Sequence, residues 1–411
     1  MLTKTQTTET KADNTPIEKK PFFDRILGST PVILTVIATI LAGMSSSEMT
    51  QAQYHRSLAA QSQSKAGDQW SFFQAKRIRG MSLQTTIDLL QAASGSARVD
   101  PAFLQAAAGQ LVASLDSIKK DSAQLETLVK NAKNFGAAGE SLNLSSAKLN
   151  QLAAARLQEA KTQAGDLDKE LGKPATQQAF AYLTSEELPV PAIKQGQNGR
   201  LGDAMKAVGE RRSEDEVREL LRNVQPEQVE QGIQTAELNA LAVERANKPV
   251  NSSLDKLAQI MQNLTRIARE VQRGGRDLAR AVKAARPGAE IDAAANAILQ
   301  TSNDARESMD EANNDLKVAE YTYMVRRYRS EADANQDAAN AYEVQVRKSS
   351  LTSENHRDRS KDFFYGMLIA QAGVTIATFS LALRFRSTLW SLATLAGVIA
   401  LAIAVRVYLF M

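Results

Sequence analysis

The chain contains no cysteine and only two histidines, His55 and His356, in 411 residues. Without thiols it can form neither a disulfide framework nor a thiolate metal site. Two histidines leave almost no material for a catalytic triad or a histidine-rich metal centre. Carboxylates are numerous, but no pattern brings a specific pair together for acid–base chemistry. We therefore predict that the protein is not an enzyme and has no metal and no cofactor.

Aromatic residues are also scarce, at 5% of the chain, whereas alanine supplies much of the 43% hydrophobic fraction. Small apolar residues mixed with Gln, Glu, Lys and Arg favour long helices that touch along narrow seams, and they predict an all-α fold. The charge is nearly balanced, with 50 basic and 46 acidic residues. This balance does not point to nucleic acid, so no nucleic-acid partner is expected.

Long hydrophobic runs lie near both ends of the chain. Residues 363–383 carry no charge, and residues 389–411 are interrupted only by Arg406. Each run matches the ~20 residues needed to cross a hydrocarbon core of ~30 Å, with a buried soluble hairpin as the alternative. A weaker run over residues 26–45 follows basic residues and is interpreted as an uncleaved span, with a cleaved signal peptide as the alternative. The lipid bilayer is thus a predicted partner.

Basic residues suggest an orientation in the membrane. The flank of the first span and the short loop after the second span are both basic, and three spans put these two regions on the same side. The positive-inside rule places that side in the cytoplasm of a bacterial inner membrane, with residues 46–362 outside it. Basic residues at 357–361 argue the other way, but the rule governs long domains poorly. The basic flanking residues are Lys19, Lys20, Arg25, Arg384 and Arg386.

The region between the spans has a helical pattern with clear punctuation. Asp100 before Pro101 marks one helix start, and Ser213 to Glu216 form a capping box at another. A further helix is expected over about 145–172. The predicted parts are a polar tail (1–25), the first transmembrane helix (26–45), a stalk and first helical part (46–172), a Pro/Gly linker (173–202), a second helical part (203–362), and two further transmembrane helices (363–383 and 389–411).

Residues 251–316 are predicted to form a helical hairpin, capped at its start by Asn251 or Ser252, with its turn at 286–288. The first arm repeats apolar residues at the near-heptad spacing of a coiled coil. A basic stripe runs beside that seam and the second arm is acidic, so we expect antiparallel pairing in which charge selects the partner more than it stabilises it. Binding of lipid headgroups or nucleic acid by this stripe is the alternative. The stripe comprises Arg266, Arg269, Arg273, Arg276, Arg280 and Lys283.

The most distinctive stretch covers residues 67–79 and is named here the DQW segment. On a helix Trp70, Phe73, Gln74 and Arg77 share a face, which suits helix packing with a cation–π contact. A ligand or partner site is the alternative to this packing role. The candidate residues are Asp68, Gln69, Trp70, Phe73, Gln74, Lys76 and Arg77.

The DQW segment after an apolar span, and the tail from His356 through the last two spans, resemble an uncharacterised bacterial membrane protein family, domain of unknown function 4337. The resemblance covers about residues 30–80 and 315–411, with Phe73 standing where many members have tyrosine. Residues 95–310 are interpreted as an insertion. The resemblance implies a similar architecture and a bacterial envelope location, and it implies no activity.

These features predict a non-enzymatic bacterial envelope membrane protein whose helical domain serves scaffolding or protein interaction. Its expected partners are the bilayer and either another protein or a second copy in a homo-oligomer. The alternative is a membrane-anchored sensor that transmits a signal, because long helices between an outer domain and membrane spans can convey small shifts. A membrane enzyme or transporter is disfavoured, because three spans with few polar groups form a poor conduit.

Overall fold

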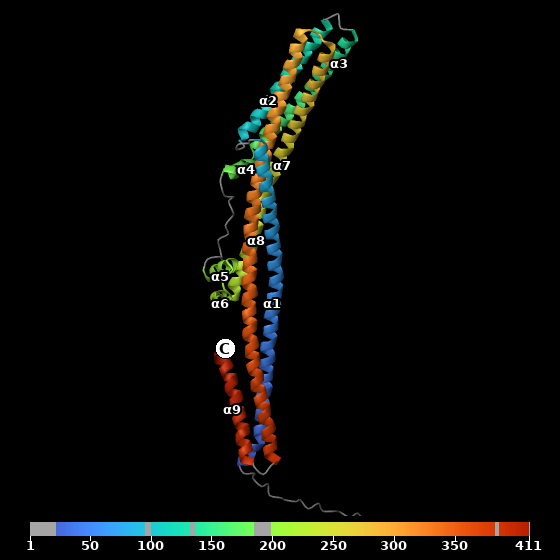
Figure 1. Cartoon of the computed structure of the whole chain (residues 1–411). Helices are drawn as coiled ribbons and strands as arrows, with labels where there is room; N and C mark the ends of the chain where they lie inside the picture. The colour runs from blue at the N-terminus through green and yellow to red at the C-terminus, as the bar shows by residue number, and fades with distance from the viewer. Residues whose placement is uncertain (1–21, 95–99, 132–135, 185–198, 383–385, 411) are drawn as a thin grey trace, which may run out of the picture. The chain divides into compact units, whose positions relative to one another are not determined.

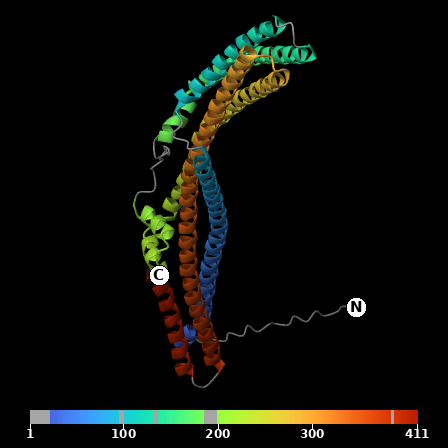
Figure 2. The ribbon, with the colours of Figure 1, turned by 45° about the horizontal axis from the view of Figure 1, so that its top comes forward.

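The computed structural model describes residues 22–94, 100–131, 136–184, 199–382 and 386–410. Within these residues every regular element is an α-helix, which confirms the predicted all-α class (Figures 1 and 2). Most of the predicted tail lies outside the described residues. The helices are α1 (Phe22–Ser94), α2 (Pro101–Asn131), α3 (Gly136–Leu171), α4 (Pro174–Thr184), α5 (Arg200–Gly209), α6 (Glu214–Arg222), α7 (Pro226–Ala285), α8 (Ala289–Ala382) and α9 (Arg386–Phe410).

The helices form two compact units. The first unit consists of Met1–Gln63 with Gln345–Met411, and the second consists of Ser64–Val344. Helices α1 and α8 contribute to both units, because each unit boundary falls inside these two helices.

Three helices of the first unit carry stretches long and apolar enough to cross a membrane, namely α1, the end of α8, and α9. Small residues let them approach closely. An added Cβ at Gly373 would lie 3.3 Å from the Ala393 carbonyl oxygen, and one at Gly397 would lie 2.6 Å from the Leu34 side chain. Contacts through Gly and Ala are typical of helix pairs in lipid, where van der Waals packing replaces the hydrophobic effect.

Hydrogen bonds join α1 to α8 just beyond the apolar stretch of α1. The hydroxyl groups of Ser45 and Ser360 each donate to the other residue's carbonyl oxygen at 2.9 Å. Further along α1, away from its apolar stretch, the Ala52 carbonyl oxygen accepts a hydrogen bond from the Ser353 hydroxyl at 2.7 Å. These paired contacts set the antiparallel register of the two helices within the first unit.

In the second unit α2 and α3 pack against α7 and α8 around one apolar core (Figure 1). The Asp100 carboxylate accepts a hydrogen bond from the Ala102 amide at 3.0 Å, and α2 begins at Pro101, as predicted. A second core joins α5, α6 and the start of α7 to α8. There Ser213 is the N-cap of α6 and accepts from the Glu216 amide, which confirms half of the predicted capping box. The Glu216 carboxylate pairs with Arg212 at 2.7 Å, and its reciprocal bond to the Ser213 amide is not found in the described residues.

The predicted start of the hairpin at Asn251 or Ser252 is wrong, because α7 begins at Pro226 and continues past Pro249. A proline inside a helix removes one backbone hydrogen bond and disfavours the helix. Here Val243 and Val250, on either side of the proline, are buried against the core, and this packing outweighs the local preference.

Two other boundaries also differ from the predictions. Part of the predicted linker 173–202 is helical, since α4 starts at Pro174, where the missing amide costs no hydrogen bond. Residues 185–198 of that linker lie outside the described residues. Helix α3 begins at Gly136 rather than near 145, because Ala137 and Ala138 favour a helix despite the flanking glycines.

The predicted turn between the two hairpin arms is confirmed. Arg286 adopts a left-handed conformation with φ 48° and donates its amide to the Val282 carbonyl oxygen, and Gly288 has φ 117°. The Gly274–Gly275 pair does not interrupt α7. An added Cβ would lie 2.8 Å from the Leu149 side chain at Gly274 and 2.8 Å from the Ser302 hydroxyl at Gly275. The two glycines therefore let α3 and α8 approach α7 from different sides.

Candidate functional site

The DQW segment lies on α1 in the second unit, where one face of α1 packs on α8. The buried and half-buried residues of this face follow a strict alternation of three and four positions, as in a helix that keeps one seam against a partner. Phe73, Leu83 and Ile87 are its large apolar members, and the others are small or polar. The residues of this face are Ala66, Gln69, Phe73, Lys76, Gly80, Leu83 and Ile87.

Trp70 is the centre of the aromatic contacts in this segment. Its indole Nε1 donates to the Glu343 carboxylate of α8 at 2.7 Å. Its ring meets Phe73 edge to face, with centroids 5.5 Å apart. The Arg77 guanidinium lies over the Phe73 ring at 5.8 Å, which is the cation–π contact expected from the sequence.

Lys76 reaches a buried carboxylate on α8. Its ammonium lies 3.0 Å from Glu331, whose side chain is 3% exposed and also binds Arg327 at 2.6 Å. Of the other candidate residues, Asp68, Gln74 and Arg77 are exposed. The Gln69 amide oxygen is buried and has no hydrogen-bond partner in the described part of the chain. The segment thus acts as a helix-packing motif that uses polar anchors.

The first unit contains a polar cluster that the sequence reasoning missed. The two histidines stack on each other, with ring centroids 5.6 Å apart and planes 5° apart. His356 Nδ1 also lies 2.5 Å from the Glu48 carboxylate of α1. Burial and, next, the charge of His356 lower the pKa of His55. The sequence signal that could have predicted this cluster is the seven-residue spacing of Ala52, Ala59 and Ala66, because it marks a packing seam on α1 that also includes His55.

Residues of the basic stripe on α7 form ion pairs with carboxylates of three helices, namely α3, α7 itself and α8. Arg269 pairs across the hairpin with Asp310 of α8 at 2.7 Å, as expected for antiparallel arms. Arg266 pairs with Glu270 of its own helix at 2.9 Å and with Glu159 of α3 at 2.5 Å. Arg280 pairs locally with Asp277, whereas Arg273 and Lys283 make no ion pair in the described part of the chain.

A four-residue ionic network therefore links α3 to α7. Arg156 of α3 contacts both Glu159 and, at 2.7 Å, Glu270. Burial tends to raise the pKa of Glu159, but hydrogen bonds from Arg156 and Arg266 outweigh it and hold that pKa below its usual range. Hydrogen bonds to Glu270 and Glu159 raise the pKa of Arg266. The sequence could not predict this network, because α3 lies about a hundred residues away.

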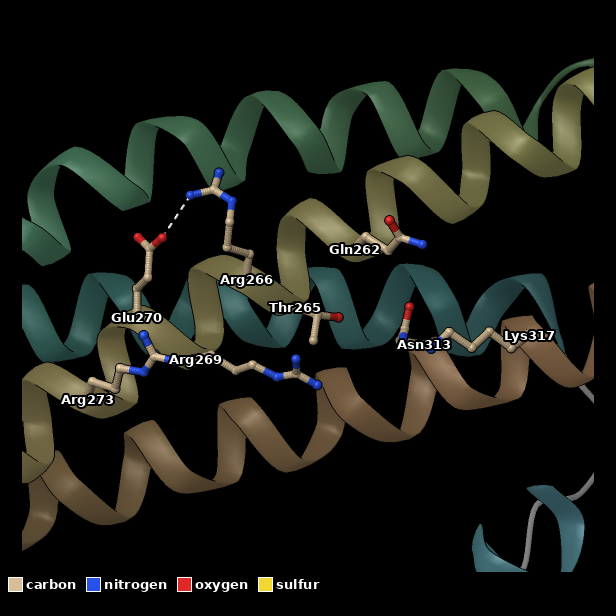
Figure 3. Close-up of a pocket in the computed structure, with 8 residues that line it drawn as sticks. All are labelled: Gln262, Thr265, Arg266, Arg269, Glu270, Arg273, Asn313 and Lys317. Carbon is tan, nitrogen blue, oxygen red and sulfur yellow. Dashed lines mark hydrogen bonds and ion pairs between the residues drawn. The ribbon is translucent and has the colours of Figure 1, made fainter. Parts of the chain in front are cut away.

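A pocket of about 470 Å³ opens between α7 and α8 beside this network (Figure 3). Its walls are mainly polar and basic. Helix α7 contributes Arg266, Arg269, Glu270 and Arg273, and α8 contributes Asn313 and Lys317. Within the described residues no group of three or more His, Cys, Asp or Glu is placed to hold a metal ion.

Residues 23–163 match the family model described as "Domain of unknown function (DUF4337)". This stretch, about a third of the chain, is therefore similar to that domain. The DUF4337 match contains the first apolar helix and the DQW segment, so it confirms the resemblance seen there. It also includes α2 and most of α3, so the part of the predicted insertion up to residue 163 belongs to the matched region. The tail over 315–411 lies outside the match, and no curated protein or solved structure matches the chain.

Proposed function

We propose that the chain is a non-enzymatic membrane protein of the bacterial envelope whose helical region scaffolds or binds another protein. Three helices long and apolar enough to cross a membrane support a membrane location. Helices α1 and α8 each pass from such a stretch into polar helix without a break. In this proposal residues 46–362 lie outside the cytoplasm.

An exposed apolar stripe on α1 carries the interaction part of the proposal. Ile78, Met81 and Leu89 are 62%, 57% and 67% exposed, and their spacing puts them on one face of the helix. This face points away from the seam that packs on α8. Large apolar side chains gathered in water are typical of a surface that binds a partner.

Photo-crosslinking in cells tests this stripe. A benzophenone amino acid placed at Met81 of the full chain should give a discrete adduct, because that side chain would lie in the interface. The matched control is Arg79, which is exposed on a different face of α1. An adduct of twice the chain's mass identifies a second copy, and another mass identifies a different protein. Equal labelling at both positions, or none at Met81, would contradict the proposal.

The second candidate function is a membrane-anchored sensor. The specific observation that favours it is the cluster of Glu48, His55 and His356, which joins α1 to α8 where α1 leaves its apolar stretch. Histidine changes charge near neutral pH, so a change of pH in that range would alter this contact and leave contacts between other side chains intact. A sensor would show crosslinks at Met81 that change with pH, whereas a scaffold would keep them constant.

A further inference from the structure

The pocket between α7 and α8 has a buried polar floor. Thr265 is 3% exposed and its hydroxyl donates to the Met261 carbonyl oxygen at 2.8 Å, so it is satisfied. Asn313 is 6% exposed, yet its side-chain amide makes no hydrogen bond in the described part of the chain. This amide lines the pocket and is not wholly shielded from solvent, so its unused donors and its acceptor are available to a ligand.

Two cationic side chains approach Asn313 from opposite directions. In Figure 3 the Arg269 guanidinium and the Lys317 ammonium extend toward each other on either side of the Asn313 amide. Asp310 fixes Arg269 by accepting from its Nε at 3.2 Å and its Nη2 at 2.7 Å. A guanidinium has five N–H donors, so donors remain for a second acceptor.

The charges around the pocket do not cancel. Arg266 is matched by Glu159 and Glu270, and Arg269 is matched by Asp310. Arg273 and Lys317 also line the pocket, and within the described residues neither makes an ion pair. No carboxylate lies within ion-pair distance of either cation, although the charge of Lys317 also acts on the nearby Glu320 and tends to lower its pKa.

Negatively charged side chains beyond Lys317 limit where an anion can bind. A neighbouring hollow shares Gln262, Asn313 and Lys317 with the pocket, but it also contains Asp255 and Glu320. These carboxylates would repel an anion. An anionic ligand is thus expected in the pocket lined by Arg269, Arg273, Asn313 and Lys317, and not in the neighbouring hollow.

We propose that this pocket binds a phosphate group, with Arg269, Asn313 and Lys317 as direct hydrogen-bond donors and Arg273 as an additional cation. A phosphate monoester carries a charge of about −1.5 to −2 at neutral pH, which matches the two unpaired cations. Its oxygens can accept from a guanidinium, an ammonium and an amide together. A single carboxylate offers one charge and two oxygens, and it would leave part of this donor set unused.

The same chemistry can come from a free phosphorylated molecule or from a lipid headgroup. Calorimetric titration of the full chain in phosphate-free detergent micelles, at constant ionic strength, distinguishes these sources. The free-phosphate arm uses inorganic phosphate, with succinate as a dicarboxylate comparison. The lipid arm uses short-chain phosphatidate, with short-chain phosphatidylcholine as its comparison. Binding of either phosphate probe over its comparison supports the site and identifies its source.

Variants then assign the binding to this pocket. Lys317→Gln and Asn313→Leu should each weaken phosphate-probe binding at least tenfold, and Arg273→Gln should weaken it several-fold. The matched control is Lys283→Gln, which removes an exposed lysine of the same hairpin outside the pocket and should bind as the wild type does. Circular dichroism confirms that each variant remains helical.

Three results would overturn the proposal. They are no binding of either phosphate probe, succinate binding as tightly as phosphate, and equal loss of binding in Lys317→Gln and Lys283→Gln. If Asn313→Leu disturbs folding, Lys317→Gln alone decides, because the Lys317 side chain is only half-buried and makes no ion pair within the described residues.

Discussion

Individual polar side chains make the most specific contacts between α1 and α8 in the second unit. The Glu331 carboxylate is buried and is held by Lys76 and by Arg327. Removing a carboxylate from water is costly, and the cost is offset only while its partners stay in place. A seam built on such a contact is expected to tolerate few substitutions at these positions.

The Lys76→Met variant should lower the free energy of unfolding by about 2 kcal/mol, because one of the two cations on a buried carboxylate is lost. Arg327 remains, so the cost stays below that of an unpaired buried charge. Denaturant unfolding of the full chain in micelles, followed by circular dichroism, measures it. The control Arg79→Met should change stability by no more than about 0.5 kcal/mol. Equal effects of the two changes would show that the pair contributes nothing.

The histidine pair predicts a dependence of stability on pH. The pKa of His55 in the folded chain is lowered from 6.5, first by burial and then by the charge of His356. The unfolded state therefore binds more protons than the folded state between the two pKa values, and stability rises with pH. The contribution of neutral His55 to stability is fully present above pH 6.5, and it is lost as the pH falls through the folded pKa of His55.

Unfolding midpoints recorded between about pH 7.5 and 5 test this, because histidine titrates in that range. The His55→Gln variant should show a flatter profile than the wild type. The facing groups, His356 and Glu48, stay unchanged in this variant, and Arg56→Gln is a control at an exposed neighbour. A profile for His55→Gln as steep as that of the wild type would contradict the assignment.

At the scale of elements, the close packing of the apolar helices depends on glycine, which has no side chain, at a few positions. Gly373 of α8 faces the Ala393 carbonyl oxygen of α9, and Leu34 of α1 lies 3.3 Å from where its Cβ would be. A backbone atom cannot move aside as the end of a flexible side chain can. Three helices thus meet at a position where any side chain would force a neighbouring atom to shift.

The Gly373→Leu variant should lower stability by about 1–3 kcal/mol, because the larger side chain forces the three helices apart. The matched control is Gly43→Leu on α1, where an added Cβ would meet nothing within 4 Å. Thermal unfolding of both variants in the same lipid or detergent measures the difference. A control as unstable as Gly373→Leu would show that leucine is harmful in these helices regardless of packing.

Some elements could be predicted from local sequence and others could not. Proline after Asp100 and serine before three acidic residues mark the starts of α2 and α6 through chemistry confined to a few neighbours. Helix α7 passes Pro249 because of burial against elements far along the chain, which local rules do not include. The packing role of the DQW segment was predicted, but its packing face was predicted only in part, because Gln69, Lys76 and Gly80 weaken the hydrophobic pattern of the seam although the spacing is regular.

At the scale of the whole molecule, the orientation of the chain in a membrane decides which partners it can meet. Single cysteines at Asn223 and Ser387 test it, and the cysteine-free chain gives no background. If the helical region lies outside the cytoplasm, a membrane-impermeant maleimide added to intact cells should label Asn223→Cys and not Ser387→Cys. The reverse pattern would place the helical region in the cytoplasm, and labelling after lysis controls for the reactivity of each site.

The serine contacts between α1 and α8 restrict how this pair of helices can move. The pair Ser45 and Ser360, the contact of Glu48 with His356, and the bond from Ser353 to Ala52 follow one another along both helices. Piston-like sliding by one helical turn, about 5.4 Å, would separate all three contacts at once. The three contacts therefore hold α1 and α8 in one register at this level, and any relative motion of the two helices here should be a tilt and not a slide.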